Sequence, residues 1–286
     1  MVSRSYLYVP GDDPGKLRRA GGRGADALIV DLEDAVPAGG KDRARETVAA
    51  WLTARDRTPG PQIWVRINPG TDGHTDLTAL PLPGITGVVL AKTESAAEVA
   101  AVDQLLTTRE RDQGLRPGAI AVVPLLESAA AILDAREIAR APRVARLQIG
   151  EADLAAEIGL DPSPDGRQWA PIRTHLVLVS AAAGIDPPVA PVSTDYRDPA
   201  ALAESTRELA RMGYVGRACI HPAQIPVVNA VFDPDPDTVA RARELVGAYR
   251  SALAEGTGVF VGADGRMVDL AVVRQAERTL DIAQRR

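Results

Sequence analysis

The 286-residue sequence predicts an α/β protein, a (β/α)8 TIM barrel followed by a C-terminal helical extension. Short runs rich in Val, Ile and Leu alternate with alanine-rich amphipathic stretches, which is typical of parallel βα units. We count eight units, the number that closes a barrel. An open doubly wound sheet would need a glycine-rich phosphate turn after its first strand, and Val9-Pro10-Gly11-Asp12-Asp13-Pro14 is not one. The barrel is therefore favoured.

The predicted elements follow one another at regular intervals. The strands are Ser5–Val9, Ala27–Asp31, Gln62–Ile67, Gly87–Ala91, Ala119–Leu125, Arg146–Ile149, Val189–Val192 and Arg217–Ile220. Helical patterns lie at Pro14–Gly22, Lys41–Ala54, Ser95–Thr108, Ala129–Ala139, Trp169–Ala183, Pro199–Arg211 and Ala223–Val231. We expect the barrel to occupy residues 1–232. The extension, 233–286, is expected to hold helices at Pro234–Ala254 and Leu270–Gln284, separated by a glycine-rich hairpin or loop at Gly256–Gly265.

Composition narrows the function classes. The 33 basic and 38 acidic residues give a net charge of −5, so the electrostatic footprint of a nucleic-acid binder is missing. A single cysteine, Cys219, excludes an internal disulfide and a multi-cysteine metal site. No stretch approaches the roughly 18 uninterrupted apolar residues of a membrane span, and the start lacks the apolar core of a signal peptide. We expect a cytoplasmic protein with no membrane partner.

Polar residues directly follow several predicted strands, and in a barrel these strand ends carry the active site. Asp31, Glu33 and Asp34 end strand two, and Arg66 ends strand three. Strand five leads into Glu127, and strand six leads into Glu151 and Asp153. Carboxylates on adjacent strand ends can share a divalent cation, and oxygen ligands with no histidine or cysteine nearby suit Mg²⁺ better than Zn²⁺.

Each of these residues also has a plainer interpretation. The strand-two acids could cap a helix or be solvated, and Arg66 could form a salt bridge to them instead of clamping a carboxylate ligand. Lys92 could form a Schiff base or pair with a rim acid such as Glu94 or Glu127, and we favour the pairing. His221 is more typical of a hydrogen-bonded structural group than of a base. Cys219 is expected to be a buried apolar side chain.

Taken together, the motifs resemble the citrate lyase β-subunit-like CoA-ester lyases of the HpcH/HpaI aldolase family. The resemblance runs from Arg4 to about Leu280, and the order of its motifs is more specific than any one of them. The motifs are Arg4–Gly11, Gly24–Val36 with Lys41 and Ala44-Arg45, Val65–Asn68, Lys92–Ser95, Leu126–Ser128, Gly150–Leu154, Cys219–Ile225 and Gly265–Asp269.

The resemblance implies a role for several residues. It implies that Glu127 and Asp153 hold Mg²⁺ and that Arg66 grips the carboxylate or oxo group of the substrate. Glu33 and Asp34 would orient Arg66 and the water molecules on the metal. The family usually assembles as a trimer or a dimer of trimers, so a homo-oligomer is expected. In members that act on free CoA esters, an aspartate at the position of Asp269 reaches into a neighbouring subunit's site as acid or base.

The resemblance also places CoA beside Tyr8, Lys16 and Arg19. One position departs from the family, which commonly has arginine or asparagine just before Pro14, where this chain has Asp13. An acid at that position repels a pyrophosphate. Either Lys16 and Arg19 carry the phosphate contact, or the acyl carrier is different.

The implied activity is Mg²⁺-dependent carbon–carbon cleavage or formation of a 3-hydroxyacyl-CoA such as malyl-CoA or citramalyl-CoA. The products of cleavage would be acetyl-CoA or propionyl-CoA and the 2-oxo acid glyoxylate or pyruvate. Three alternatives stay open. They are a malyl-CoA thioesterase, a citrate lyase β subunit acting on an acyl-carrier-protein thioester, and a Schiff-base aldolase using Lys92.

Overall fold

The computed structural model describes residues 3–55, 60–163, 165–254, 256–257, 259–262, 265 and 267–284. The chain forms two compact units, and the division between them falls after Ala230, within helix α10 (Gln224–Phe232). Residues 3–230 form the first unit, and residues from 231 onward form the second. No helix in the described ranges is both long enough and apolar enough to cross a membrane.

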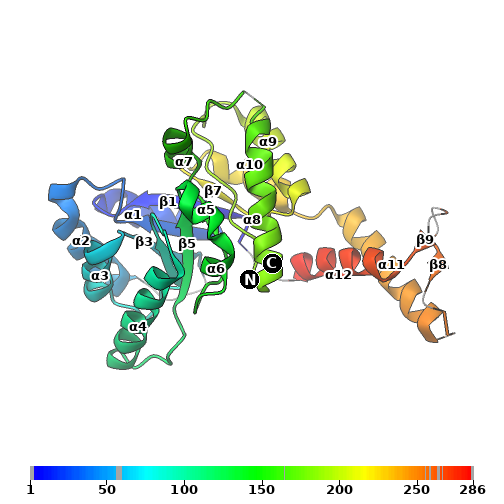
Figure 1. The fold of residues 1–286 in the computed structure, drawn as a ribbon, viewed down its shortest axis with the longest axis horizontal. Helices are drawn as coiled ribbons and strands as arrows, with labels where there is room; N and C mark the ends of the chain where they lie inside the picture. Colours follow the sequence, from blue (N-terminus) through cyan, green and yellow to red (C-terminus); the bar gives the residue numbers. More distant parts are fainter. Residues whose placement is uncertain are drawn as a thin grey trace. The chain divides into compact units, whose positions relative to one another are not determined.

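The first unit is built on one parallel sheet with the strand order β6-β5-β4-β3-β2-β1-β7 (Figure 1). Its strands are β1 Ser5–Pro10, β2 Ala27–Asp31, β3 Gln62–Ile67, β4 Gly87–Leu90, β5 Ala121–Leu126, β6 Gln148–Ile149 and β7 Arg217–Cys219. The seventh predicted strand, Val189–Val192, is reduced to two bridging residues. Val189 pairs with Gln148 of β6, and Ala190 pairs with Arg217 of β7. These bridges close the ring, so the predicted (β/α)8 barrel is confirmed.

Helices connect the strands and cover the outside of the sheet (Figure 1). They are α1 Pro14–Ala20, α2 Lys41–Ala54, α3 Gly70–Ala79, α4 Ala96–Asp112, α5 Ala129–Leu133, α6 Ala135–Ala139, α7 Glu151–Ile158, α8 Ala170–Ala183, α9 Pro199–Met212 and α10. The sequence prediction missed α3 and α7. The α3 sequence is rich in glycine and threonine, so its apolar residues show no clear helical period. Helix α7 begins directly at Glu151, where the prediction assigned only the end of strand six.

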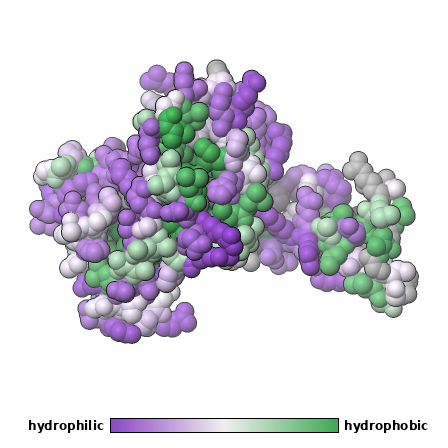
Figure 2. Space-filling model, viewed as in Figure 1, coloured by the Kyte–Doolittle hydropathy of each residue, from purple (hydrophilic) through white to green (hydrophobic). Residues whose placement is uncertain are grey.

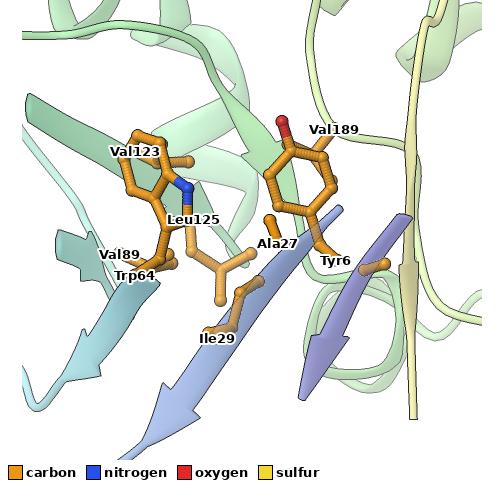
Figure 3. Close-up of a cluster of buried hydrophobic side chains, with 9 residues drawn as sticks. Tyr6, Ala27, Ile29, Trp64, Val89, Val123, Leu125 and Val189 are labelled. Carbon is orange, nitrogen blue, oxygen red and sulfur yellow. The ribbon is translucent and has the colours of Figure 1, made fainter. Parts of the chain in front are cut away.

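The barrel interior is filled by apolar side chains from successive strands (Figure 3). The buried cluster consists of Tyr6, Ala27, Ile29, Trp64, Val89, Val123, Leu125, Val189 and Ala218. A Cβ atom at position 87 would lie 2.5 Å from the Trp64 ring, so β4 needs Gly87 there. Arg146 enters this core and donates to the Tyr6 hydroxyl at 2.6 Å and to Asp186 at 2.8 Å. These close-packed side chains fill the inside of the barrel below the carboxyl ends of the strands.

The second unit is a pair of helices with a small hairpin. It contains α11 Pro236–Ala254, β8 Phe260–Val261, β9 Met267–Val268 and α12 Leu270–Gln284, as the sequence pattern predicts. Its apolar cluster consists of Ala242, Val246, Tyr249, Val268, Val273 and Ala276. Asp269 begins α12, because its Oδ1 accepts hydrogen bonds from the backbone N–H groups of Ala271 (3.0 Å) and Val272 (3.1 Å). Arg266, from the motif that contains Asp269, lies outside the described residues.

Candidate active site

A pocket of about 450 Å³ opens at the carboxyl ends of the barrel strands, and we call it the rim pocket. Seven of the residues singled out in the sequence line it, from five strand ends. They are Tyr8, Asp31, Asp34, Arg66, Glu127, Glu151 and Asp153. Parallel strands end on the same edge, which is why residues so far apart in sequence meet here.

Arg66 is fixed to Asp31 by a bidentate ion pair. Its Nε donates to Asp31 Oδ1 at 2.7 Å and its Nη2 to Oδ2 at 2.5 Å. The register of β2 and β3 places these two residues side by side. Asp31 also accepts the backbone N–H groups of Glu33 (2.8 Å) and Ala35 (3.2 Å). Arg66 therefore forms the expected salt bridge to the strand-two acids, with Asp31 as its bidentate partner. Its contact with a ligand stays a prediction.

The remaining guanidinium nitrogen of Arg66 faces the next two acids. Its Nη1 lies 3.0 Å from Glu33 Oε2 and 3.4 Å from Asp34 Oδ2. The guanidinium carbon lies 5.0 Å from the centre of the Tyr8 ring. Burial lowers the pKa of Arg66, but the hydrogen bonds to Asp31 and the surrounding negative groups raise it by more than burial lowers it. The pKa is therefore above its ordinary value, and the guanidinium keeps its charge.

The Lys92 ammonium pairs with Glu33 and Asp34. Its Nζ donates to Glu33 Oε1 and, at 3.2 Å, to Asp34 Oδ1. The predicted pairing with a rim acid is confirmed, but the acids are Glu33 and Asp34 instead of Glu94 or Glu127. Only the Lys92 backbone N–H reaches Glu127. Partial burial lowers the pKa of Lys92, while the bonds to Glu33 and Asp34 raise it well above its ordinary value. The amine is held protonated, which is unfavourable for a Schiff-base nucleophile.

The turn after β2 is held by a buried polar network. Leu32 O accepts hydrogen bonds from Lys41 Nζ (2.8 Å) and Asn68 Nδ2 (2.9 Å). Asp76, fully buried in α3, accepts both Asn68 N (2.8 Å) and Asn68 Nδ2 (2.7 Å), and it accepts Arg45 Nε at 2.7 Å. The motif residues Lys41, Arg45 and Asn68 thus set the position of the loop that carries the acids.

Glu127 is a buried carboxylate at the end of β5. Its Oε2 accepts the Lys92 backbone N–H at 2.8 Å, and Lys92 adopts a φ of 48° to present it. A Cβ atom at Gly150 would lie 2.4 Å from Glu127 Oε1, so only glycine leaves room for this side chain. Burial raises the pKa of Glu127 to about 7, and the charges of Glu33 and Asp153 add to the increase. Negative charge is concentrated here.

The oxygen donors around Glu127 fit Mg²⁺. Glu127 and Asp153 line one wall of the rim pocket with Gln148, whose Nε2 donates to the Tyr8 hydroxyl at 3.0 Å. The buried Gln148 Oε1 accepts no hydrogen bond from the described residues. Within these ranges no cluster of three or more His, Cys, Asp or Glu side chains forms a metal-binding group. Mg²⁺ commonly takes only one or two carboxylates and keeps several waters, so this donor set suits it.

Two strand-end residues are committed to structural contacts. Glu151 forms a bidentate ion pair with Arg173, with distances of 2.7 and 2.8 Å. Because both of its oxygens are used in this pair, Asp153 is the better candidate of the two for a metal ligand. His221 accepts the backbone N–H of Ala223 at Nδ1 (3.1 Å), and its ring stacks on Tyr196 with centroids 4.5 Å apart. The structural interpretation of His221 therefore agrees with the geometry.

A second pocket of about 360 Å³ carries basic residues, and we call it the basic pocket. Lys16, Arg19 and Arg23 line it together with Tyr8. Asp13, the departure noted in the sequence, is the N-cap of α1 and accepts Lys16 N at 2.9 Å. Its Oδ2 lies 3.6 Å from Lys16 Nζ. The acid is thus partly balanced by Lys16 and by the helix N-terminus.

A family model for the HpcH/HpaI aldolase/citrate lyase domain matches residues 4–222. The chain belongs to this family. The resemblance inferred from the motifs is confirmed, and the match covers every residue that lines the rim pocket or the basic pocket. Asp269 lies beyond the match, in the second unit, and its part in a site stays a prediction.

Full-length relatives carry several different activities in their names. The citrate lyase subunit β of Leuconostoc mesenteroides subsp. cremoris is 32% identical, with 99% of this chain and 93% of that protein covered. A (3S)-malyl-CoA thioesterase of Cereibacter sphaeroides is 34% identical, with coverages of 98% and 94%. An L-malyl-CoA/β-methylmalyl-CoA lyase of the same species is 32% identical, with coverages of 96% and 92%.

Among solved structures, CitE from Mycobacterium tuberculosis in complex with magnesium, acetoacetate and coenzyme A is 33% identical. Its TM-score is 0.76, with 98% of this chain and 97% of that chain covered. The fold of this chain thus has a structural counterpart over nearly its whole length.

The Asp31–Arg66 pair yields a test of stability. We expect Asp31→Asn to lower the free energy of unfolding by about 3 kcal/mol, because it leaves a buried guanidinium without its carboxylate. Asp34→Asn should change it by less than about 1 kcal/mol, since the Asp34 side chain is 56% exposed. Chemical denaturation of both variants measures the difference. An equal decrease in the free energy of unfolding for both variants would contradict the conclusion that Asp31 is the main partner of Arg66.

Proposed function

We propose that the protein is a Mg²⁺-dependent carbon–carbon lyase for a 3-hydroxyacyl-CoA of the malyl-CoA or citramalyl-CoA type. Its products are acetyl-CoA or propionyl-CoA and glyoxylate or pyruvate. The observation that carries this proposal is the rim pocket, which is lined by two carboxylates suited to Mg²⁺ and by a guanidinium held in place by Asp31. Lyases of CoA esters among the full-length relatives support the same reaction class.

The chemistry fits the residues that line the pocket. When the 3-hydroxyl group loses its proton and the bond between the α and β carbons breaks, the products are a 2-oxo acid and an enolate of the CoA ester. The enolate carbon then takes up a proton to give acetyl-CoA or propionyl-CoA. Glu127 and Asp153 would hold Mg²⁺, which polarises the substrate oxygen when bound. Arg66, held in place by Asp31, meets the developing oxyanion without having to reorganise. Glu33 and Asp34 position Arg66 from the other side.

A malyl-CoA thioesterase is the second candidate, because a relative with that name is as similar to this chain as the lyase. A third is the citrate lyase β subunit, which takes its acyl group from a carrier protein. These three share the metal and the arginine and differ in which bond breaks and in the acyl carrier. The Schiff-base aldolase is disfavoured by the protonated, doubly paired Lys92.

The proposal is tested by supplying MgCl₂ with malyl-CoA, citramalyl-CoA or β-methylmalyl-CoA and following the 2-oxo acid and free CoA separately. We expect release of 2-oxo acid that EDTA stops and Mg²⁺ restores. Free CoA released from malyl-CoA without any 2-oxo acid would instead identify the thioesterase. No reaction with any free CoA ester would favour the carrier-protein thioester.

Glu127→Ala should lower kcat/KM by more than about 10²-fold, a loss that even outer-shell partners of a metal can cause. The matched control is Glu94→Ala, since Glu94 is an exposed acid that follows β4 outside the rim pocket. Circular dichroism and thermal unfolding check that both variants fold. Retained activity in Glu127→Ala would contradict its place at the metal.

Lys16 and Arg19 are proposed to bind the phosphates of CoA in the basic pocket, with Tyr8 on the wall shared with the rim pocket. Arg19→Ala should raise KM for the CoA ester by about tenfold and leave kcat little changed, because a remote binding contact is lost. Arg18→Ala is the control, since the adjacent exposed Arg18 does not line the pocket. Equal KM values for the two variants would rule out this site for CoA.

The homo-oligomer is also proposed, with Asp269 acting as acid or base in the site of a neighbouring copy. Apolar side chains support an interface, since several in the second unit are solvent-exposed. Figure 2 shows hydrophobic residues gathered on the visible face of this unit. The exposed residues are Leu253, Val259, Val261, Met267, Leu270 and Val272. A second copy of the chain would remove this surface from water.

Co-expression of Asp269→Ala chains with Glu127→Ala chains tests the shared site. Each variant alone should be inactive. In mixed oligomers, about a quarter of the sites would combine both native residues from two copies and recover activity. If the two residues act within one chain, mixing restores nothing, and the proposal fails.

A further inference from the structure

The rim pocket and the basic pocket share three residues, Tyr8, Pro10 and Ile220. The two pockets differ in charge. One holds the acids and Arg66, and the other holds Lys16, Arg19 and Arg23. A ligand with a small acid at one end and phosphates at the other must pass the three shared residues. They form the junction between its two ends.

Ile220 is the member of this junction whose side chain can most readily change the space available. Tyr8 is held by the hydrogen bond from Gln148 and lies against Arg66, and Pro10 belongs to strand β1. Ile220 directly follows β7, and the pairing of Leu7 with Cys219 brings it beside Tyr8. Its side chain is 42% exposed although it is a large aliphatic group.

The backbone at Ile220 is firmly positioned. The buried Gln224 accepts the N–H groups of Ile220 (2.8 Å) and His221 (3.1 Å) at Oε1. Gln224 Nε2 donates to Ser193 O at 2.9 Å, which connects this turn to the segment that follows the bridging residues Val189 and Ala190. Val192 of that segment lines the rim pocket with Ile220. The isoleucine therefore stands at a defined place in the pocket wall.

We propose that Ile220 determines which acyl group the enzyme accepts, by contacting the carbon next to the thioester carbonyl. This inference rests on the proposed lyase function. In malyl-CoA this carbon carries two hydrogens, whereas in β-methylmalyl-CoA it carries a methyl group. The 2-oxo acid part lies deeper, beside Arg66 and Glu127, while the phosphates lie in the basic pocket, so the thioester end passes Ile220.

The position of the methyl group makes the inference specific. Citramalyl-CoA carries its extra methyl on the carbon that bears the hydroxyl, which belongs to the deep end of the rim pocket. A change at Ile220 should therefore alter the preference between β-methylmalyl-CoA and malyl-CoA. It should leave the preference between citramalyl-CoA and malyl-CoA unchanged.

The experiment measures kcat/KM for the three esters with Mg²⁺ present. Ile220→Ala should raise the ratio of β-methylmalyl-CoA to malyl-CoA by about tenfold, the scale of discrimination for one methyl group in an apolar pocket. Ile220→Phe should lower that ratio. The ratio of citramalyl-CoA to malyl-CoA should change by less than about twofold in both variants.

Ile158→Ala is the matched control, because Ile158 has a similar exposure (45%) in α7 and lines neither pocket. Ile220→Val supplies a milder change if Ile220→Ala does not fold. Unchanged ratios in active Ile220 variants would overturn the inference and leave the lyase assignment intact. Absence of cleavage of all three esters by the native chain would overturn both.

Discussion

The ion pair between Asp31 and Arg66 is the interaction on which the site depends. Both residues are buried at the ends of neighbouring strands, where a charge without a partner is strongly unfavourable. Asp31 satisfies two guanidinium nitrogens and two backbone N–H groups of the following turn at once. One carboxylate therefore sets the orientation of the arginine and the path of the loop that carries Glu33. The fold itself therefore sets the positions of these charged groups.

Much of the barrel could be predicted because parallel strands buried on both faces appear as short apolar runs. β2, β3 and α2 have the predicted bounds, and the second unit has its two helices in the expected places. The predictions failed where the pattern was weak. The glycine-containing α3 shows little apolar periodicity, and the helical pattern at 129–139 divides into two helices at Asp134. The last strand to close the ring contributes only two paired residues.

The strand-end rule identified most of the charged residues that line the rim pocket, because all parallel strands present their carboxyl ends on one edge. It did not identify the uncharged lining residues Gln148, Val192 and Ile220. It also could not identify the partners of the charged residues. The hydrogen bond from Lys92 to Glu33 joins residues 59 positions apart. Arg66 forms its bidentate pair with Asp31 and not with Glu33 or Asp34, which follow it in the sequence. Such choices depend on register and side-chain reach, which appear only in three dimensions. Asp76 gave no signal at all, since it lies on the helix that the pattern missed.

The brevity of the closing contact has a mechanical consequence. Val189 and Ala190 join β6 to β7 through single bridges, whereas most neighbouring strands share longer ladders. The barrel thus has a seam, and local opening of a fold begins where the fewest hydrogen bonds must break. The seam runs directly into Val192, on the wall of the rim pocket. Local opening between β6 and β7 would widen the pocket without disturbing β2 and β3. A bulky ligand could then enter on one side of the ring while the charged groups on the other side keep their positions.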